Sequence, residues 1–430
     1  MSIPVEVKLW GRTIGAASTD GSGVTAFEYD PRFQNSGIQI SPLTMPLSDR
    51  VYRFPKLAKD TYHGLPGLLA DSLPDKFGNA LINTWLARQG RTSASFSPIE
   101  RLCYTGTRGM GALEFFPSTN PITPASSTLE IDKLVQLASE VLSNRNTLHS
   151  QLSPEDTSAL TDILRVGTSA GGARAKAVIA WNPTTSEVRS GQIEAGSGFQ
   201  HWLLKFDGVS SNKDKEFEDP KGYSALEYAY HLMAVKAGID MMPCQLLEEN
   251  GRRHFMTQRF DRTPEGQKLH MQSLCAMAHF DLAGAYSYEQ AFLTIRQLGL
   301  DMDTIEQQFR RMAFNIVARN QDDHVKNIAF LMDKSGQWSL SPAFDITYSY
   351  NPTGDWTSSH QMSLNGKRDD FTLDDFIACG KVTSMKRGRA KTILAEVTET
   401  VSQWQTFAHE ANIDNNWAKQ IAKAHRLAIS

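Results

Sequence analysis

The stretch Asn320-Gln321-Asp322-Asp323-His324-Val325-Lys326-Asn327 places an aspartate and an asparagine five positions apart. A carboxylate can accept the proton of a hydroxyl group, and an amide oxygen is a hard donor that suits Mg²⁺. Two short apolar runs flank Asp333-Lys334-Ser335-Gly336 and predict a hairpin that returns the chain to Pro342-Ala343-Phe344-Asp345. Asp345 would then lie beside the first stretch as the main metal ligand.

These parts follow the order of a protein-kinase catalytic loop, in which Asp-x-x-x-x-Asn is followed by a second aspartate. Asp322 would accept the proton of the substrate hydroxyl, and Asn327 and Asp345 would bind Mg²⁺. Lys326 would neutralise charge on the transferred phosphoryl group. An alternative is that Asp322 and Asn327 only cap helix ends. His324 is a candidate for contact with the cofactor, but a single histidine is more often a hydrogen-bonding group that braces the loop.

A glycine-rich loop at residues 167–176 precedes a predicted strand over 177–181. Backbone amides of Ser169, Ala170, Gly171 and Gly172 could surround phosphate oxygens. The loop lacks the Walker A pattern, and such a loop alone is more often an ordinary turn. Its position before a strand that carries a lysine favours the phosphate-binding interpretation.

That lysine is Lys205, near the end of a predicted strand over 202–206, and Glu227 follows in a predicted helix over 223–237. Either residue alone is more often a solvated surface charge. As a pair, they could form the ion pair that positions ATP phosphates in kinases. A hairpin around Asn250-Gly251 is predicted next.

The remaining sequence predicts a mixed N-terminal part and a helical C-terminal part. Alternation of Val5, Val7 and Leu9 predicts a strand. Pro74 is expected at the first position of a helix that runs to about Gln89. After Asp261 the chain is predicted to be mostly helical. We therefore expect an α+β fold with two lobes and ATP between them, and three domains: an N-terminal domain (1–118), a kinase N-lobe (119–261) and a helical C-lobe (262–430).

Bulk composition is that of an ordinary globular protein with ample core, since 40% of the 430 residues are hydrophobic and the net charge is −3. This charge gives no reason to expect nucleic-acid binding by the whole surface. Four widely spaced cysteines form no CxxC pair, so neither a zinc site nor a disulfide framework is expected. No signal peptide or membrane span is recognised, and we expect a cytoplasmic location.

The sequence resembles the HipA family of toxin kinases from bacterial type II toxin–antitoxin systems over nearly its whole length. The resembling segments are Gly64-Leu65-Pro66 to Gly78, Gly106 to Leu113, Ser169 to Lys176, Gln258 to Arg262, Asp322 to Asn327 and Pro342 to Asp345. The resemblance implies a kinase-like fold and an ATP- and Mg²⁺-dependent serine/threonine protein kinase. It gives no catalytic reason for the first two segments.

The resemblance also implies roles for single residues. Lys205 would bind ATP phosphates, Gln258 and Phe260 would contact adenine at the hinge, and Asp261 would hydrogen-bond the ribose. Ser169 matches an autophosphorylation site that ejects the phosphate-binding loop and switches the kinase off, and its neighbour Thr168 is an alternative acceptor. Here Gln258 replaces a hinge carboxylate, and no glycine follows Asp345.

The partners implied are a small helix-turn-helix antitoxin of HipB type, operator DNA bound through that complex, and a protein substrate such as an aminoacyl-tRNA synthetase. A basic cluster at residues 386–391 could touch DNA phosphates, although a solvated charged loop is the more usual case. Two other functions stay open: a non-catalytic co-repressor with a kinase fold, and a small-molecule or lipid phosphotransferase.

Overall fold

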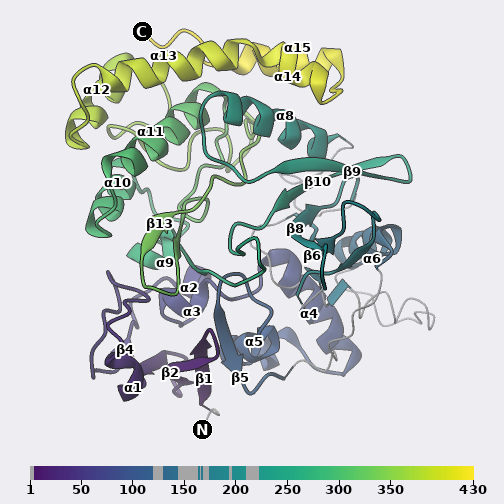
Figure 1. The fold of residues 1–430 in the computed structure, drawn as a ribbon, viewed down its shortest axis with the longest axis vertical. Helices are drawn as coiled ribbons and strands as arrows, with labels where there is room; N and C mark the ends of the chain where they lie inside the picture. Colours follow the sequence, from purple (N-terminus) through teal and green to yellow (C-terminus); the bar gives the residue numbers. More distant parts are fainter. Residues whose placement is uncertain are drawn as a thin grey trace.

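The computed structural model describes residues 4–119, 129–143, 163–164, 166–167, 174–192, 196–209 and 222–430. Figure 1 shows the chain starting at one end of the long axis and finishing at the other. An N-terminal sheet lies at the first end, two further sheets lie in the middle, and long helices cover the opposite end. The predicted succession of a mixed part and a mostly helical part is confirmed.

The first sheet is antiparallel, in the order β4-β3-β2-β1-β5. Its strands are β1 (Val5–Leu9), β2 (Arg12–Thr19), β3 (Thr25–Tyr29), β4 (Tyr52–Arg53) and β5 (Leu113–Phe116). Val5, Val7 and Leu9 are buried while the residues between them are half-buried, as the alternation predicted. The sheet thus turns one face of β1 to the core.

Helices lie between the strands of this sheet along the chain, with α1 between β3 and β4 and the others between β4 and β5. They are α1 (Pro31–Gln34), α2 (Lys59–Tyr62), α3 (Gly67–Ala70), α4 (Lys76–Arg88), the 3₁₀ helix η1 (Ser93–Ser95) and α5 (Pro98–Thr105). The prediction that Pro74 opens a helix is wrong by two positions. Asp75 is the N-cap of α4, because its side chain accepts a hydrogen bond from the amide of Gly78, and Pro74 lies before this cap.

The second sheet has the antiparallel order β7-β6-β8-β10-β9. Its strands are β6 (Lys176–Trp181), β7 (Val188–Ser190), β8 (Gln200–Lys205), β9 (Cys244–Glu249) and β10 (Arg252–Gln258), and helices α6 (Ile131–Ser143) and α8 (Tyr223–Lys236) accompany it. Asn250 and Gly251 both have positive φ and close the predicted β9–β10 hairpin.

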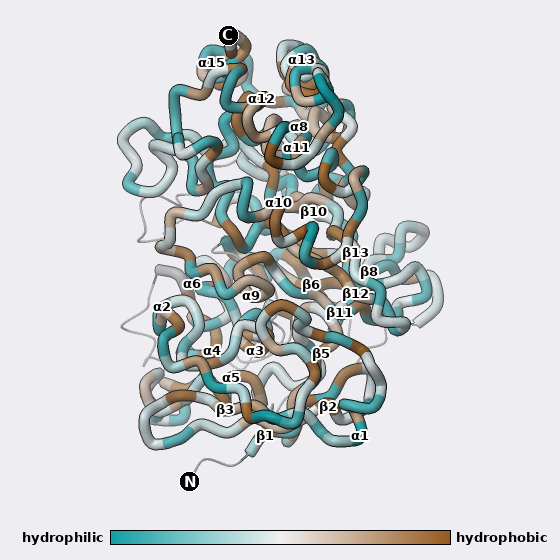
Figure 2. Tube along the Cα trace, turned by 90° about the vertical axis from the view of Figure 1, so that its left-hand side faces the viewer, coloured by the Kyte–Doolittle hydropathy of each residue, from teal (hydrophilic) through white to brown (hydrophobic). Residues whose placement is uncertain are grey.

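One core cluster joins α4 to this second sheet. Phe77 and Leu81 of α4 are buried with Leu134 of α6 and with Ile179 and Leu204 of the sheet. Residues on both sides of the predicted boundary near residue 118 therefore share one core. The division into three domains stays a prediction. In Figure 2 the tube around β6 and α9 is largely brown, as expected for interior segments.

The third sheet, β11-β12-β13, contains β11 (His270–Ser273), β12 (Ala329–Met332) and β13 (Trp338–Leu340). The hairpin of β12 and β13 was predicted, whereas β11 was not. The helices of this part are α9 (Leu274–Ala278), α10 (Tyr288–Gln297), α11 (Met302–Val317), α12 (Leu373–Val382), α13 (Arg389–Ser402), α14 (Trp404–Glu410) and α15 (Asn415–Ala424). In the described part of the chain, no helix is both long and apolar enough to cross a membrane.

Candidate active site

Lys205, the last residue of β8, is buried between two carboxylates. Its Nζ lies 2.6 Å from Oε1 of Glu227 in α8, and it also donates to Oδ1 of Asp345. Burial acts against the charged lysine, but Asp345 and Glu227 outweigh it and hold the pKa of Lys205 above its ordinary value. The structure thus brings together three residues that lie far apart in the sequence.

Glu227 has a second cationic partner that the sequence analysis did not single out. Arg174 Nη1 lies 3.1 Å from Oε2 of Glu227, so each carboxylate oxygen faces one cation. Glu227 is almost fully buried, and a carboxylate there is tolerable only because it is paired. Arg174 lies near the C-terminal end of the predicted glycine-rich loop, 167–176. Within that loop, the predicted phosphate ligands Ser169, Ala170, Gly171 and Gly172 lie outside the described residues.

Asp345 follows β13 in a left-handed conformation, with φ of +52°. Asp is one of the few non-glycine residues that adopt this region readily. Just before it, the amide of Ala343 donates to the carbonyl of Asp240 at 2.8 Å. Burial raises the pKa of Asp345, but Lys205 more than offsets this, and the net pKa lies below the ordinary value. The carboxylate is therefore ionised and aimed at Lys205.

The loop 320–328 between α11 and β12 has no regular structure, and hydrogen bonds hold its two predicted site residues, Asp322 and Asn327, in place. Asn327 Nδ2 donates to the carbonyl of Asp322 at 2.8 Å, and the amide of Asn327 donates to the carbonyl of His324 at 2.9 Å. Trp356 Nε1 donates to Oδ1 of Asp322 at 2.7 Å. Neither Asp322 nor Asn327 is the N-cap of a described helix, which disfavours the capping alternative.

Asp322 is the candidate proton acceptor, and its side chain keeps 34% of its surface exposed. Burial raises the pKa of Asp322, while His324 and the Trp356 hydrogen bond oppose the rise. Asp345 is close enough to add to it electrostatically. His324 Nε2 lies 3.8 Å from Oδ1 of Asp322, which fits the predicted bracing role better than contact with a cofactor.

Asp323, which the sequence analysis did not single out, anchors the loop. Its buried carboxylate accepts from Tyr288 Oη at 2.6 Å, from the amide of Gln361 at 2.7 Å and from His360 Nδ1 at 2.8 Å. His360 holds the pKa of Asp323 below its ordinary value despite burial. The Asp-Asp doublet in the sequence was the available signal, although it does not show which of the two carboxylates is buried.

Lys326, the predicted phosphoryl-neutralising residue, lies near two carboxylates of the N-terminal part. Burial raises the pKa values of Asp71 and Asp75, and Lys326 is among the cations that oppose this rise. Asp75 also lies 3.0 Å from Nζ of the buried Lys176. Segment 71–75 thus places two carboxyl groups near loop 320–328 and β6.

The predicted adenine-binding hinge lies at the end of β10. The amide of Gln258 donates to the carbonyl of Pro243 at 2.9 Å, so this N–H is already engaged. The rings of Phe260 and Phe344 lie 5.2 Å apart, and their contact joins the hinge to the residue before Asp345.

The position of Asp261 argues against the predicted ribose contact. The residue is completely buried, and its carboxylate accepts two hydrogen bonds from Arg259, at 2.8 and 2.7 Å, and one from Arg262 at 2.8 Å. It also accepts the amide of Gly111 at 2.7 Å. These partners hold the pKa of Asp261 far below its ordinary value despite burial. Asp261 therefore ties the hinge to the segment Gly106 to Leu113.

The oxygen donors available fit a magnesium ion bound together with phosphates. Among the described residues, no group of three or more His, Cys, Asp or Glu side chains gathers as a metal site. Mg²⁺ rarely uses such a protein cage, and it is usually held by one or two side-chain oxygens plus phosphate and water. The two predicted ligands, Asp345 and Asn327, carry oxygen donors of this kind.

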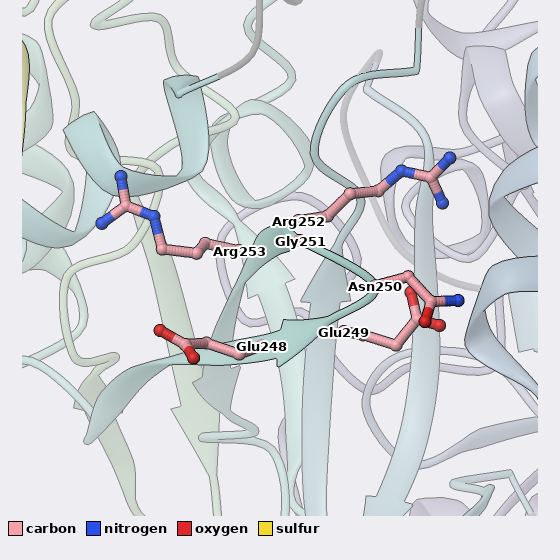
Figure 3. Close-up of a pocket in the computed structure, with 6 residues that line it drawn as sticks. All are labelled: Glu248, Glu249, Asn250, Gly251, Arg252 and Arg253. Atoms are coloured by element: carbon pink, nitrogen blue, oxygen red, sulfur yellow. The ribbon is translucent and has the colours of Figure 1, made fainter.

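A shallow hollow at the tip of the β9–β10 hairpin lies away from these residues. Figure 3 shows Arg253 and Glu248 on one side of the turn, and Arg252, Glu249 and Asn250 on the other. Arg253 Nη1 donates to the carbonyl of Ala411 at 2.8 Å. The hairpin tip thus fastens the second sheet to the end of α14, and its side chains do not converge on a common point.

The fold and site define a two-lobed, kinase-like α+β protein, with the Lys205 cluster where the second sheet meets the helical part. Residues 168–405 match the family model of the HipA-like C-terminal domain, and residues 5–116 match that of the HipA N-terminal domain. The chain belongs to the HipA family. This result confirms the resemblance seen in the sequence.

Comparison with individual proteins agrees with this assignment. HipA in the complex of the Shewanella oneidensis MR-1 toxin–antitoxin system, with HipB and operator DNA, is similar in fold. The TM-score is 0.69 at 17% identity, over 97% of this chain and 94% of that one. "Putative kinase Y4mE" of Sinorhizobium fredii is 24% identical over 195 residues, which are 42% of this chain but only 39% of that protein.

Proposed function

We propose that this protein is an ATP- and Mg²⁺-dependent serine/threonine protein kinase. The observation that carries the proposal is the buried Lys205, held at once by Glu227 and by Asp345. A kinase needs a phosphate-binding lysine fixed by a helix glutamate and a metal-binding aspartate near it. In this chain those residues come from β8, α8 and the segment after β13.

In the proposed reaction, Lys205 binds phosphate oxygens of ATP, and Lys326 neutralises charge on the transferred group. Asp322 accepts the proton of the acceptor hydroxyl. Asn327 and Asp345 would hold Mg²⁺, which when bound neutralises the charge of the phosphates. The backbone around Gln258 and the ring of Phe260 would contact the adenine. Positioning and electrostatics of this kind account for most of the catalysis of phosphoryl transfer.

We further propose that the kinase is the toxin of a HipA/HipB-type module. Its partners would be a helix-turn-helix antitoxin and, through that antitoxin, operator DNA. Family membership and the likeness to the Shewanella HipA fold support this proposal. A translation-related protein such as an aminoacyl-tRNA synthetase is the proposed substrate class.

The predicted basic cluster at 386–391 is partly neutralised, which weakens a DNA role. Arg389 Nε lies 2.8 Å from Oε2 of Glu306, and Nη1 lies 3.5 Å from Oε1 of Glu396. Lys386, Arg387 and Lys391 are exposed. If the cluster contacts DNA in the antitoxin complex, Arg387→Ala will reduce the salt dependence of DNA binding, whereas an unchanged dependence supports a solvated loop.

Autophosphorylation of Ser169 is the proposed means of switching the kinase off. A phosphate of charge near −2 at this place would repel the phosphates of ATP and could reorder the glycine-rich loop. Thr168 is the alternative acceptor.

The test is the intact mass of phosphatase-treated protein after incubation with ATP and Mg²⁺. We expect the wild type to gain one phosphate that maps to Ser169. Asp322→Asn should lose roughly 10²–10⁴-fold of the rate, since a general base contributes that much. Asp333→Asn, a matched change in the exposed β12–β13 turn, serves as control. No phosphate gain together with no ATP binding would support the co-repressor alternative instead.

A further inference from the structure

One oxygen of the Asp322 carboxylate, the candidate proton acceptor, accepts a hydrogen bond from Trp356, a residue without a role in the proposed reaction so far. Trp356 Nε1 donates to Oδ1 of Asp322 at 2.7 Å, across 34 positions of sequence. The indole N–H is a donor only, so its hydrogen bond to a carboxylate oxygen has a fixed direction. Hydrogen bonds to an ionised acceptor are among the stronger ones in proteins.

The segment that carries Trp356 is fastened to the neighbouring residue of the same loop. Asp323 Oδ1 accepts the amide of Gln361 at 2.7 Å, and Oδ2 accepts Nδ1 of His360 at 2.8 Å. His360 and Asp323 are fully or almost fully buried, so this attachment is shielded from water. Two adjacent carboxylates of the catalytic loop thus hold one segment, 356–361, by independent hydrogen bonds.

Gln361 also folds the segment back on itself. Its Nε2 donates to the carbonyl of Trp356 and, at 3.2 Å, to that of Ser359. These bonds set the direction in which the Trp356 side chain leaves the backbone. The indole therefore reaches Asp322 from a hydrogen-bonded turn, and its ring lies 6.4 Å from that of His324.

This arrangement leaves Oδ2 of Asp322 available to accept a proton. Asp322 and Trp356 are both half-buried, whereas Asp323 and His360, which attach the segment to the loop, are buried. A general base must present one lone pair to the hydroxyl within hydrogen-bond distance, and small errors of orientation reduce the rate strongly. The carboxylate of Asp322 can rotate about its side-chain bonds. A hydrogen bond from a fixed donor to Oδ1 limits this rotation and so orients Oδ2.

We propose that Trp356 is a positioning residue for phosphoryl transfer: its indole N–H fixes Oδ1 of Asp322 and directs Oδ2 toward the acceptor hydroxyl. The inference rests on the proposed function. In the step concerned, the acceptor O–H bond breaks and its proton passes to Asp322. The acceptor oxygen bonds to the γ-phosphorus of ATP while the bond to the bridging oxygen breaks, and ADP leaves with that electron pair.

The test compares Trp356→Phe with the wild type in phosphate transfer from ATP to itself and to myelin basic protein. Phe keeps an aromatic ring but lacks both the N–H donor and the second ring of the indole, so the same substitution at another tryptophan is needed as a control. We expect kcat to fall about 10- to 100-fold, as misorientation of a catalytic group does, while KM for ATP changes less than twofold. Trp338→Phe is the matched control, because Trp338 also donates Nε1 to an acceptor, the carbonyl of Gln39, away from the site.

A spectroscopic readout that does not need activity accompanies the kinetics. In protein labelled with ¹⁵N-tryptophan, Trp356→Phe identifies one indole N–H signal among those of the eight tryptophans. We expect Asp322→Ala to move this signal and Asp333→Ala to leave it in place. If the chemical shift of this signal is unchanged in Asp322→Ala, the proposed contact is overturned, whatever the kinetics show.

The possible kinetic outcomes separate the two proposals. An active wild type with an equally active Trp356→Phe variant overturns the positioning role and leaves the kinase proposal standing. A parallel change in kcat, KM for ATP and melting temperature also overturns it, because that pattern is one of general damage. A wild type that transfers no phosphate to either acceptor overturns the proposed function, and the positioning role with it.

Discussion

At the scale of single residues, charge is balanced around Lys205. Its ammonium group faces Glu227 and Asp345, and Arg174 faces the second oxygen of Glu227. Removing one member of a buried group of charges leaves the others without compensation, and this costs more than an intact pair contributes. The cluster is thus both a structural joint between the second sheet and α8 and the proposed phosphate site.

Glu227→Gln tests both roles of this cluster. We expect a lower free energy of unfolding, by less than the roughly 3–5 kcal/mol that breaking a buried pair can cost, because Asp345 still pairs with Lys205. ATP affinity should fall at least several-fold, since Lys205 is held less firmly. Urea unfolding and ATP titration measure the two effects. Glu248→Gln, at an exposed position of the β9–β10 hairpin, should change neither, and an equal loss there would contradict the prediction.

At the scale of elements, α3 of the N-terminal part contacts α9, and α9 in turn contacts loop 320–328. Gly67 of α3 donates its amide to Nε2 of His279, and the Asp71 carboxylate accepts from Ser273, the N-cap of α9. The amide of Cys275 in α9 then donates to the carbonyl of Val325 in the loop at 3.1 Å. These contacts give the segment Gly64 to Gly78 a physical role that the sequence did not reveal.

Gly67→Ala should disturb this packing. A Cβ there would lie 2.5 Å from the carbonyl oxygen of Ala276, so α3 and α9 would have to move apart. Overpacking of this kind typically costs about 1–3 kcal/mol. We expect a lower melting temperature and, because α9 contacts the loop, a lower kcat.

The matched control is Gly21→Ala. A Cβ at Gly21 would meet no atom within 4 Å, and this glycine is not in the left-handed region. Equal melting temperatures of the two variants would show that the α3–α9 contact can relax at no cost.

At the scale of the whole molecule, buried and half-buried histidines link stability to pH. Burial lowers the pKa to about 4 for five of them, which are His231, His254, His270, His279 and His425. In the unfolded chain the same groups titrate near pH 6.5. Above pH 6.5 both states are neutral at these sites. Between about pH 6.5 and 4 the unfolded state binds protons that the folded state does not, so the free energy of unfolding falls.

We therefore expect the urea midpoint to decrease steadily from pH 7 to pH 5. His270→Gln should flatten this dependence, because His270 alone accounts for roughly 3 kcal/mol at most over its full pKa difference. Gln can still donate to the carbonyl of Ile40, which His270 Nε2 contacts at 3.0 Å. His409→Gln, at an exposed position, should leave the slope unchanged. A flat midpoint in the wild type would contradict the prediction.

The sequence by itself determined what depends on neighbours along the chain. The grouping of Lys205, Glu227 and Asp345 was predicted from the order of parts that protein kinases use, and not from neighbours along the chain. Alternation predicted β1, and Asn250-Gly251 predicted the β9–β10 hairpin. Such signals are local because turns, strand faces and helix periods are set within a few residues. The error at Pro74 is also local, since the Asp75 cap decides where α4 begins.

Only the tertiary structure decided which polar side chains complete the site. Asp261 was predicted to bind ribose, but Arg259, Arg262 and the distant Gly111 surround it. Trp356 and Asp322 are 34 positions apart, and Lys205 and Asp345 are 140 apart. No local pattern encodes such pairs. They arise because each buried charge or donor must find a partner among whatever groups packing brings near it.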